Sequence, residues 1–420
     1  MRCWKCLLMI VLLCLPGWAE PEPSEPAAPP EATEEAQDET DFMRPSGGQL
    51  GIGGDEGFGL GTAVGDPTAL NGPTRTPIVL FGTDRESLID LTGYYSHKFN
   101  SEHRLLVEGS LDPNYLGLDV SYTISPKAWE GALTFNSWIA SGSFAPYEAG
   151  GREIFLPPNR NAHVQMLGGG VEYVQPFTEE LDVAFGLNYQ QYAFSTALLG
   201  GSRYRVDSNG FPLTVANRSA AEDFLGFRIH GLFSTLDDRD LPIEGTKIRF
   251  GMEQSIGLGA PSFNQLSANV AHLFRMPGFN DGDHSLLVNL QAGTNLGEPP
   301  PIRAFHMGGA QSVRGYDPGE LASGKSFLQT TVEYRHHLHT FNLFDTDFHA
   351  RLALFHDYGT TLGTADQLRG MPPILLGKPE HAYGYGAGIH LASEYGLFRL
   401  ESAWNGQGQN SFYFTVGERF

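Results

Sequence analysis

From about residue 76 onward, apolar and polar residues alternate along unusually long segments of the chain. In ELDVAFGLNYQQ, residues 180–191, the odd positions from 181 to 189 are all apolar, and the even positions are polar or small. HSLLVNLQAG, residues 284–293, and SFYFTVGERF, residues 411–420, show similar alternation. A period of two predicts β-strands with one apolar face. Segments of about nine to fourteen residues are long for a globular strand and suit tilted strands that cross a membrane.

The segments and their connections predict an all-β fold. The four longest connections, 140–162, 195–223, 297–325 and 358–382, each follow an odd-numbered segment, which is typical of an outer-membrane barrel and unexplained by a soluble sandwich or propeller. We therefore expect a 16-stranded antiparallel transmembrane outer-membrane β-barrel over residues 76–420, surrounded by outer-membrane lipids, with its N-terminus periplasmic. The sixteen predicted strands are 76–82, 87–97, 103–111, 115–124, 130–139, 163–175, 180–194, 224–235, 245–256, 263–275, 284–296, 326–338, 347–357, 383–392, 395–404 and 411–420.

The composition agrees with a β-protein and excludes one class of partner. The chain has 52 glycines among 420 residues, which fits many tight turns. Its net charge of −21 would repel phosphates, so we expect no nucleic-acid partner.

The N-terminal 75 residues lack the alternation. Residues 1–19 resemble a secretory signal peptide, with Arg2 and Lys5 before an apolar core at 7–15. All three cysteines lie in this segment, and Cys14 as a lipidation site is the alternative, although the bulky Leu13 precedes it. Residues 20–75 are expected to be disordered: an acidic Pro/Glu-rich stretch, then a Gly-rich tether that could also begin a strand or lie in the lumen.

The chain contains no sequence signature of catalysis. G-x-S-x-G, H-E-x-x-H and the phosphate-binding loop are all absent, so we expect no enzyme activity and no cofactor. The nearest metal candidate is RHHLH, where His337 and His339 share one face and His336 lies on the other. Two histidines need a third ligand, so polar residues at a strand end are the favoured interpretation and no metal is expected.

One long connection contains a specific motif. Residues 306–327 read HMGGAQSVRGYDPGELASGKSF, with Gly308 and Gly309 followed by Val313, Arg314, Gly315 and Tyr316. This resembles the signature loop of the BamA/TamA-type outer-membrane assembly barrels, the bacterial surface antigen family. TLDDRDLPIEGTKIRFGM at 235–252, VEYR at 332–335, FHDYGTTLG at 355–363 and the hairpin 383–404 resemble the same family. The resemblance covers about 224–420, and the ending GERF is most similar to the cyanobacterial and chloroplast branch.

The resemblance implies a role for the arginine. In the family this loop folds back into the lumen, which would pair Arg314 with Glu333 and Asp357 as a structural latch. A guanidinium has five donors in a rigid fork and can bind two carboxylates. Gly315 would permit the turn, and Val313 and Tyr316 would pack on the wall. The alternative is a solvated Arg314 whose ion pairs contribute about 0–1 kcal/mol.

The last segment carries a second feature. Phe412, Phe414, Val416 and Phe420 share one face of the predicted final strand. A terminal aromatic residue of this kind is typical of the C-terminal signal that outer-membrane assembly machinery recognises. The alternative is a simple aromatic anchor at the membrane interface.

The resemblance implies a function in membrane-protein assembly. We expect a barrel that assists insertion of outer-membrane proteins, with a weak seam between the first and last strands. Family members usually carry periplasmic POTRA domains, and the polar 20–75 segment is too short for one, so unfolded client proteins and a separate POTRA-bearing partner are the expected partners. The alternative is a gated pore for polypeptide or solute. An enzymatic barrel, such as a protease or lipase, lacks a convincing set of residues.

Overall fold

The computed structural model describes fifteen stretches of the chain, and all structural statements below concern them. The predicted signal peptide, the tether at 20–75 and Phe420 lie outside the described residues. Within the described part, no helix is long and apolar enough to span a membrane. The described residues are 78–82, 90–112, 115–142, 155–158, 160–210, 212–214, 220–238, 241–276, 284–300, 303–317, 319–343, 346–362, 378–393, 396–416 and 419.

Sixteen of the described strands have five or more residues, and the other three have two residues each. The short ones are β6 (Phe155–Leu156), β7 (Arg160–Asn161) and β10 (Arg203–Tyr204). The long ones are β1 (Ile78–Gly82), β2 (Asp90–Asn100), β3 (His103–Asp112), β4 (Tyr115–Ile124), β5 (Ala132–Gly142), β8 (His163–Pro176), β9 (Leu181–Ser195), β11 (Ala221–Ser234), β12 (Gly245–Gly257), β13 (Phe263–Arg275), β14 (Ser285–Gly297), β15 (Ser326–Leu343), β16 (Thr346–Leu362), β17 (His381–Ser393), β18 (Gly396–Asn405) and β19 (Asn410–Val416).

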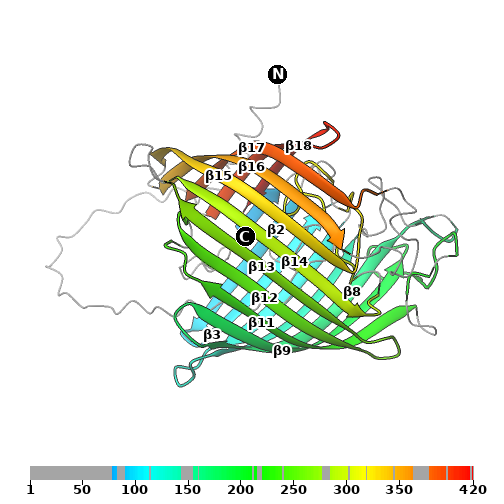
Figure 1. Ribbon diagram of the computed structural model, residues 1–420. Helices are drawn as coiled ribbons and strands as arrows, with labels where there is room; N and C mark the ends of the chain where they lie inside the picture. The colour runs from blue at the N-terminus through cyan, green and yellow to red at the C-terminus, as the bar shows by residue number, and fades with distance from the viewer. Residues whose placement is uncertain are drawn as a thin grey trace, which may run out of the picture. The chain divides into compact units, whose positions relative to one another are not determined.

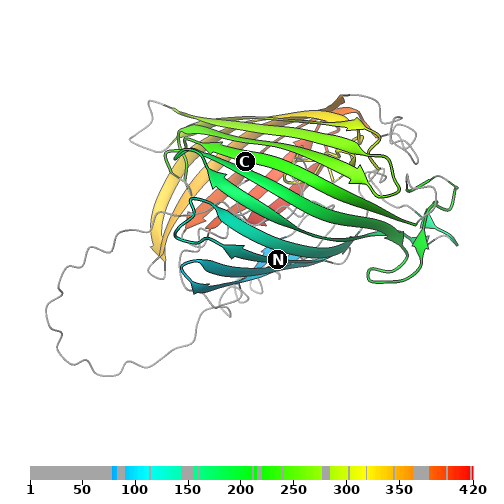
Figure 2. The same ribbon diagram turned by 90° about the horizontal axis from the view of Figure 1, so that it is seen from below.

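Each long strand pairs with the next long strand in antiparallel register, from β1–β2 through β18–β19. The first strand, β1, contacts the last strand, β19, so the two ends of the sheet meet. Figure 1 shows the tilted strands from the side, and Figure 2 shows the same cylinder from below. The predicted 16-stranded antiparallel barrel is therefore confirmed.

The pattern of side-chain burial is the reverse of that in a soluble protein, because apolar side chains are exposed and polar side chains are buried. On β14, Leu290 is 45% exposed, whereas its neighbour Asn289 is fully buried and Gln291 is buried beside it. On β9, Leu187 is exposed and Asn188 is buried. Apolar residues outside and polar residues inside are the pattern of a barrel whose outer face contacts lipid. The alternation in the sequence thus places the polar residues in the lumen.

Several strand limits differ from the prediction. β2 is shifted by three residues, to Asp90–Asn100, and β15 extends to Leu343 with an irregularity between His337 and His339. The last strand ends at Val416 rather than at the C-terminus, and the side chain of Arg419 enters the lumen instead. Loss of strict alternation near these strand ends explains why the sequence placed them imprecisely.

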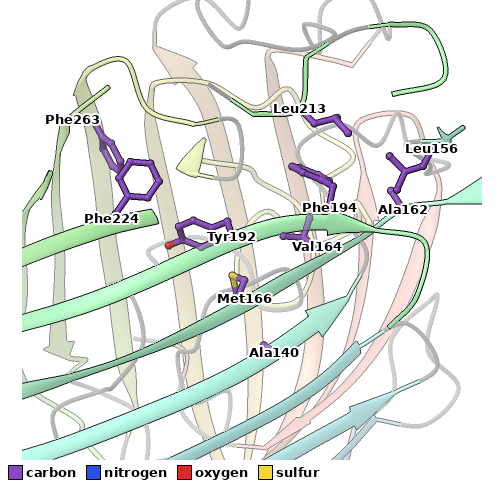
Figure 3. Packing of buried hydrophobic residues seen from close by; sticks show 10 residues of the cluster. All are labelled: Ala140, Leu156, Ala162, Val164, Met166, Tyr192, Phe194, Leu213, Phe224 and Phe263. Carbon is purple, nitrogen blue, oxygen red and sulfur yellow. The ribbon is translucent and has the colours of Figure 1, made fainter. Parts of the chain in front are cut away.

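Described parts of two long connections, those before β8 and β11, pack over the inside of the barrel. Leu156, before β8, and Leu213, before β11, are both buried against luminal side chains such as Phe194. The full cluster, drawn in Figure 3, is Ala140, Leu156, Ala162, Val164, Met166, Tyr192, Phe194, Leu213, Phe224 and Phe263. Apolar residues therefore cover part of the lumen beneath these loops.

Candidate functional site: a loop held inside the barrel

The connection between β14 and β15 folds back on itself, and we call residues Ala304–Lys325 the finger. Phe305 and Gly324 exchange two backbone hydrogen bonds, of 3.0 and 2.9 Å, at its base. Near its tip, the N–H of Gly309 donates to the carbonyl of Tyr316 at 2.8 Å. Its apolar side chains pack together with two residues of the wall; the cluster is Phe305, Met307, Val313, Tyr316, Leu321, Phe327 and Ala382. The finger is therefore a folded unit rather than an extended loop.

Glycines permit the tight backbone at the tip. Gly308, Gly309 and Gly315 have φ values of +116°, +84° and +96°, which residues with a Cβ rarely adopt. A Cβ on Gly315 would also lie 2.8 Å from the backbone nitrogen of Asn405 on β18. Backbone conformation thus favours glycine at all three positions, and close approach to the wall adds a second requirement at Gly315.

Arg314 lies at the finger tip and is completely buried. Its Nε donates to Oδ2 of Asp357 at 2.7 Å, its Nη2 donates to Oδ1 at 3.0 Å, and its backbone N–H donates to Oδ2 at 3.1 Å. Its Nη1 donates to Glu333 at 3.1 Å and to Glu401 at 2.9 Å. The guanidinium therefore makes a bidentate pair with one carboxylate and bridges two others, a geometry that lysine cannot reproduce.

Three strands supply the carboxylates. Glu333 is on β15, Asp357 on β16 and Glu401 on β18, each on the inward face. The guanidinium carbon of Arg314 also lies 3.3 Å from the ring centroid of Phe355 on β16. A desolvated cation over an aromatic face contributes about 2 kcal/mol in favourable cases. One side chain of the finger thus connects three wall strands, two of which, β15 and β16, are direct neighbours.

Further basic residues surround the carboxylates. Nε of Arg335 donates to Glu333 at 2.9 Å, Nε2 of His390 lies 3.0 Å from Glu401, and Nη1 of Arg399 lies 3.9 Å from Glu401. Arg419, beyond β19, donates to Asp357 at 3.0 Å and to the carbonyl of Ser312. Burial, followed by the positive charge of Arg314, lowers the pKa of Arg419 to about 10, which leaves it charged at neutral pH. The buried acids are therefore neutralised by several cations.

The same cluster contains groups that could bind a metal. Ligand atoms of Glu333, His390 and Glu401 lie within 4.8 Å of one another. Nη1 of Arg314 is already hydrogen-bonded to both glutamates, so a guanidinium takes the place that a cation would need. The donor set fits an ion-pair network better than a metal site.

The other sequence-predicted residues have simpler positions. The ring of His336, on β15, stacks on that of His284 at 4.2 Å, and the N–H of His337 donates to His284. Phe412 on β19 is exposed on the outer face, and Phe414 is half-buried. Val416 ends β19, and Phe420 lies outside the described residues.

Sequence reasoning missed Glu401 and Arg419. The signal for Glu401 was present, because Arg399, Glu401 and Asn405 alternate with Leu400 and Trp404 and must share the luminal face. Arg419 gave no such signal, because its contacts depend on where the chain turns after β19 ends. The structure brings Arg314, Glu333 and Asp357 together and adds these two residues.

This fold and site define a class of protein: an outer-membrane β-barrel with a folded loop bound inside its lumen. Residues 103–420 match the Omp85 superfamily domain, and the chain belongs to this superfamily. It is 29% identical over 266 residues to outer envelope protein 80, chloroplastic, of Arabidopsis thaliana, which covers 63% of this chain and 34% of that protein. It is 29% identical over 186 residues to protein TOC75, chloroplastic, of Pisum sativum, which covers 42% of this chain and 21% of that protein.

Solved structures share the fold. The crystal structure of BamA from Haemophilus ducreyi lacking POTRA domains 1–3 matches with a TM-score of 0.58 and 14% identity, over 82% of this chain and 70% of that one. CdiB from Escherichia coli matches with a TM-score of 0.53 and 13% identity, over 80% of this chain and 61% of that one. The chain spans about a third or less of the length of the two plant relatives named above.

Proposed function

We propose that this barrel assists the insertion and assembly of proteins in an outer membrane. The observation that supports it best is the finger, which Arg314 binds to three strands of the wall inside the lumen. A barrel of this width would otherwise enclose an aqueous channel, and the bound finger narrows it while it braces three wall strands. Membership of the Omp85 superfamily supports the same role.

The proposal includes an orientation and partners. Short turns such as 101–102 and 177–180 lie at the end of the barrel opposite the long loops. We place this end, with the short turns, on the periplasmic side. Unfolded barrel proteins would arrive there, delivered by a partner that carries POTRA domains. The outer face carries Leu290, Leu187 and similar side chains for contact with outer-membrane lipids. No bond-making chemistry is proposed.

Reconstitution tests the insertase activity. The purified chain is placed in phospholipid liposomes, and a urea-unfolded eight-stranded test barrel is diluted into them while its folding is followed on unheated gels. We expect folding to accelerate severalfold relative to empty liposomes. Arg275→Ala, which removes an exposed arginine paired with Asp237 and Glu244, is the matched control and should act like the original chain. Equal folding rates with and without the barrel would contradict the proposal.

The second candidate function is a gated pore for polypeptide or solute. A barrel of sixteen strands is wide enough for an aqueous channel, and this width favours it. Planar-bilayer recording separates the two functions. A large, steady conductance in the unmodified barrel, together with no effect on the folding of the test barrel, would favour the pore.

A further inference from the structure

A second buried arginine, Arg303, directly precedes the finger and is not part of the motif. The side chain of Arg303 is 1% exposed. Its Nη2 lies 3.0 Å from Glu253 on β12 and donates to Gln265 on β13 at 2.9 Å. Its Nη1 donates to the hydroxyl of Tyr192 on β9 at 3.2 Å. Arg303 therefore binds three strands of the wall, as Arg314 does.

The two arginines bind different parts of the wall. Arg303 contacts β9, β12 and β13, whereas Arg314 contacts β15, β16 and β18. In Figure 1 these two groups of strands lie on either side of β14, the strand that leads into the finger. We call the contacts of Arg303 the base anchor and those of Arg314 the tip anchor.

The surroundings of Arg303 stabilise a buried positive charge. Glu253 is buried, and it also pairs with Arg228 at 3.3 Å and accepts a hydrogen bond from Ser255 at 2.6 Å. The guanidinium carbon of Arg303 lies 5.5 Å from the ring centroid of Phe263, within the range of a cation–π contact. The amide of Asn295 on β14 donates to the carbonyl of Arg303 at 2.8 Å, which fixes the backbone as well.

The part of the finger between the anchors is packed as one unit. Its backbone bonds between Phe305 and Gly324 and its apolar cluster hold base and tip together. Loss of the tip anchor would therefore release one end of a rigid body, while the other end stays bound to β9, β12 and β13.

We propose that Arg303 is a positioning residue that acts as the pivot of the finger, so the lumen opens in two stages. Release of Arg314 swings the tip away from β15, β16 and β18, and the base anchor keeps the finger within the barrel. Full opening requires release of both arginines. This inference concerns regulation of the luminal site proposed above, and its test does not depend on insertase activity.

Two probes separate the stages. With Cys3, Cys6 and Cys14 replaced by serine, single cysteines can be placed at Ala304 beside the base anchor and at Ala310 near the tip, both of which are buried. Each is combined with Arg303→Met, Arg314→Met or both, and maleimide labelling is measured in folded barrels. Arg275→Ala is the charge-matched control.

The proposal predicts a specific pattern. Arg314→Met should increase labelling of the Ala310 cysteine by about tenfold or more, which corresponds to about 1.4 kcal/mol. The Ala304 cysteine should stay protected in this variant. Arg303→Met should increase labelling at Ala304. The steady conductance of the double variant in planar bilayers should exceed that of either single variant severalfold.

Two results would overturn the pivot. One is full maleimide labelling of both cysteines in Arg314→Met alone, because the base anchor would then not keep its end of the finger bound. The other is unchanged conductance when Arg303→Met is added to Arg314→Met. If Arg303→Met does not fold, Gln265→Met replaces it, because this change removes one hydrogen bond of the base anchor. It should increase maleimide labelling of the Ala304 cysteine by a smaller factor and leave the Ala310 cysteine protected. No increase in that variant would also count against the proposal.

Discussion

The hydroxyl of Tyr413, on the last strand, accepts a hydrogen bond of 2.9 Å from the backbone N–H of Gly315 at the finger tip. The same hydroxyl donates to the carbonyl of Tyr316 at 3.3 Å. The strand that closes the barrel is therefore bound directly to the loop inside it. Because β19 has only seven residues and meets the five-residue β1, this contact supports the shortest part of the wall.

Tyr413→Phe should weaken this closure. It leaves the buried N–H of Gly315 without its acceptor, which costs about 1–3 kcal/mol. We expect a lower temperature for conversion from the folded to the unfolded band on unheated gels. Tyr358→Phe, on the outer face of β16, is the matched control and should change little. An equal shift in both variants would show that the hydroxyl of Tyr413 has no special role.

Arg314→Lys should fail to replace arginine. A single ammonium cannot make the bidentate pair with Asp357 while it bridges Glu333 and Glu401. Complete removal of one partner from a buried ion-pair network costs roughly 3–5 kcal/mol, and the lysine, which keeps the charge, should lose part of this amount. The expected readouts are lower heat resistance and cleavage of the finger by added protease. Arg275→Lys, at an exposed pair, should preserve both properties. Wild-type heat resistance in Arg314→Lys would mean that charge alone is sufficient.

Part of this site agrees with the alternation of apolar and polar residues along the strands. The family resemblance implied Glu333 and Asp357, and the period of two permits both to point inward. The same rule extends to Glu401 beside Leu400. The alternation could not identify the base anchor. Arg303 lies in an irregular segment, and its partners Glu253 and Tyr192 are 50 and 111 residues away in the sequence. Only the packing of the finger across the lumen brings them together.

The sequence also did not predict which wall positions leave space for the finger. A glycine in a strand indicates a bulge or a close approach but does not identify what approaches. In the structure, a Cβ on Gly384 would overlap the carbonyl oxygen of Arg314, and a Cβ on Gly359 would lie 2.7 Å from Val313. Both glycines are on inward positions of the wall directly behind the finger tip.

Gly384→Ala should therefore displace the finger tip without changing any charged residue. The added methyl group meets backbone, which cannot rotate away, so the tip anchor must shift. We expect increased labelling of a cysteine at Ala310 and reduced heat resistance. Gly109→Ala on β3 is the control, because its Cβ would come no nearer than 3.8 Å to the carbonyl of Gly117. Protection of the Ala310 cysteine in Gly384→Ala would contradict the close packing seen here.

Leu290→Arg should test which face of the wall meets lipid. Leu290 is exposed on β14, and an arginine on a lipid-facing position costs about 2–4 kcal/mol near the middle of the bilayer. We expect a lower yield of folded barrel in liposomes and a lower urea midpoint of unfolding. Lys98→Arg, at an exposed position near the end of β2, provides the control for an added guanidinium. Normal folding of Leu290→Arg would argue against a membrane around this face.

The packing of the finger should also depend on pH through His306. Burial, and then the nearby charge of Lys378, lower the pKa of His306 from 6.5 to about 4. Because the unfolded chain binds this proton more readily, the contribution of the neutral ring is complete above pH 6.5 and decreases as the pH falls toward 4. The loss is at most about 3 kcal/mol. Heat resistance measured at pH 7.5, 6, 5 and 4 should fall less steeply in His306→Leu than in the original chain. Parallel curves for the two proteins would show that His306 does not contribute to the acid sensitivity.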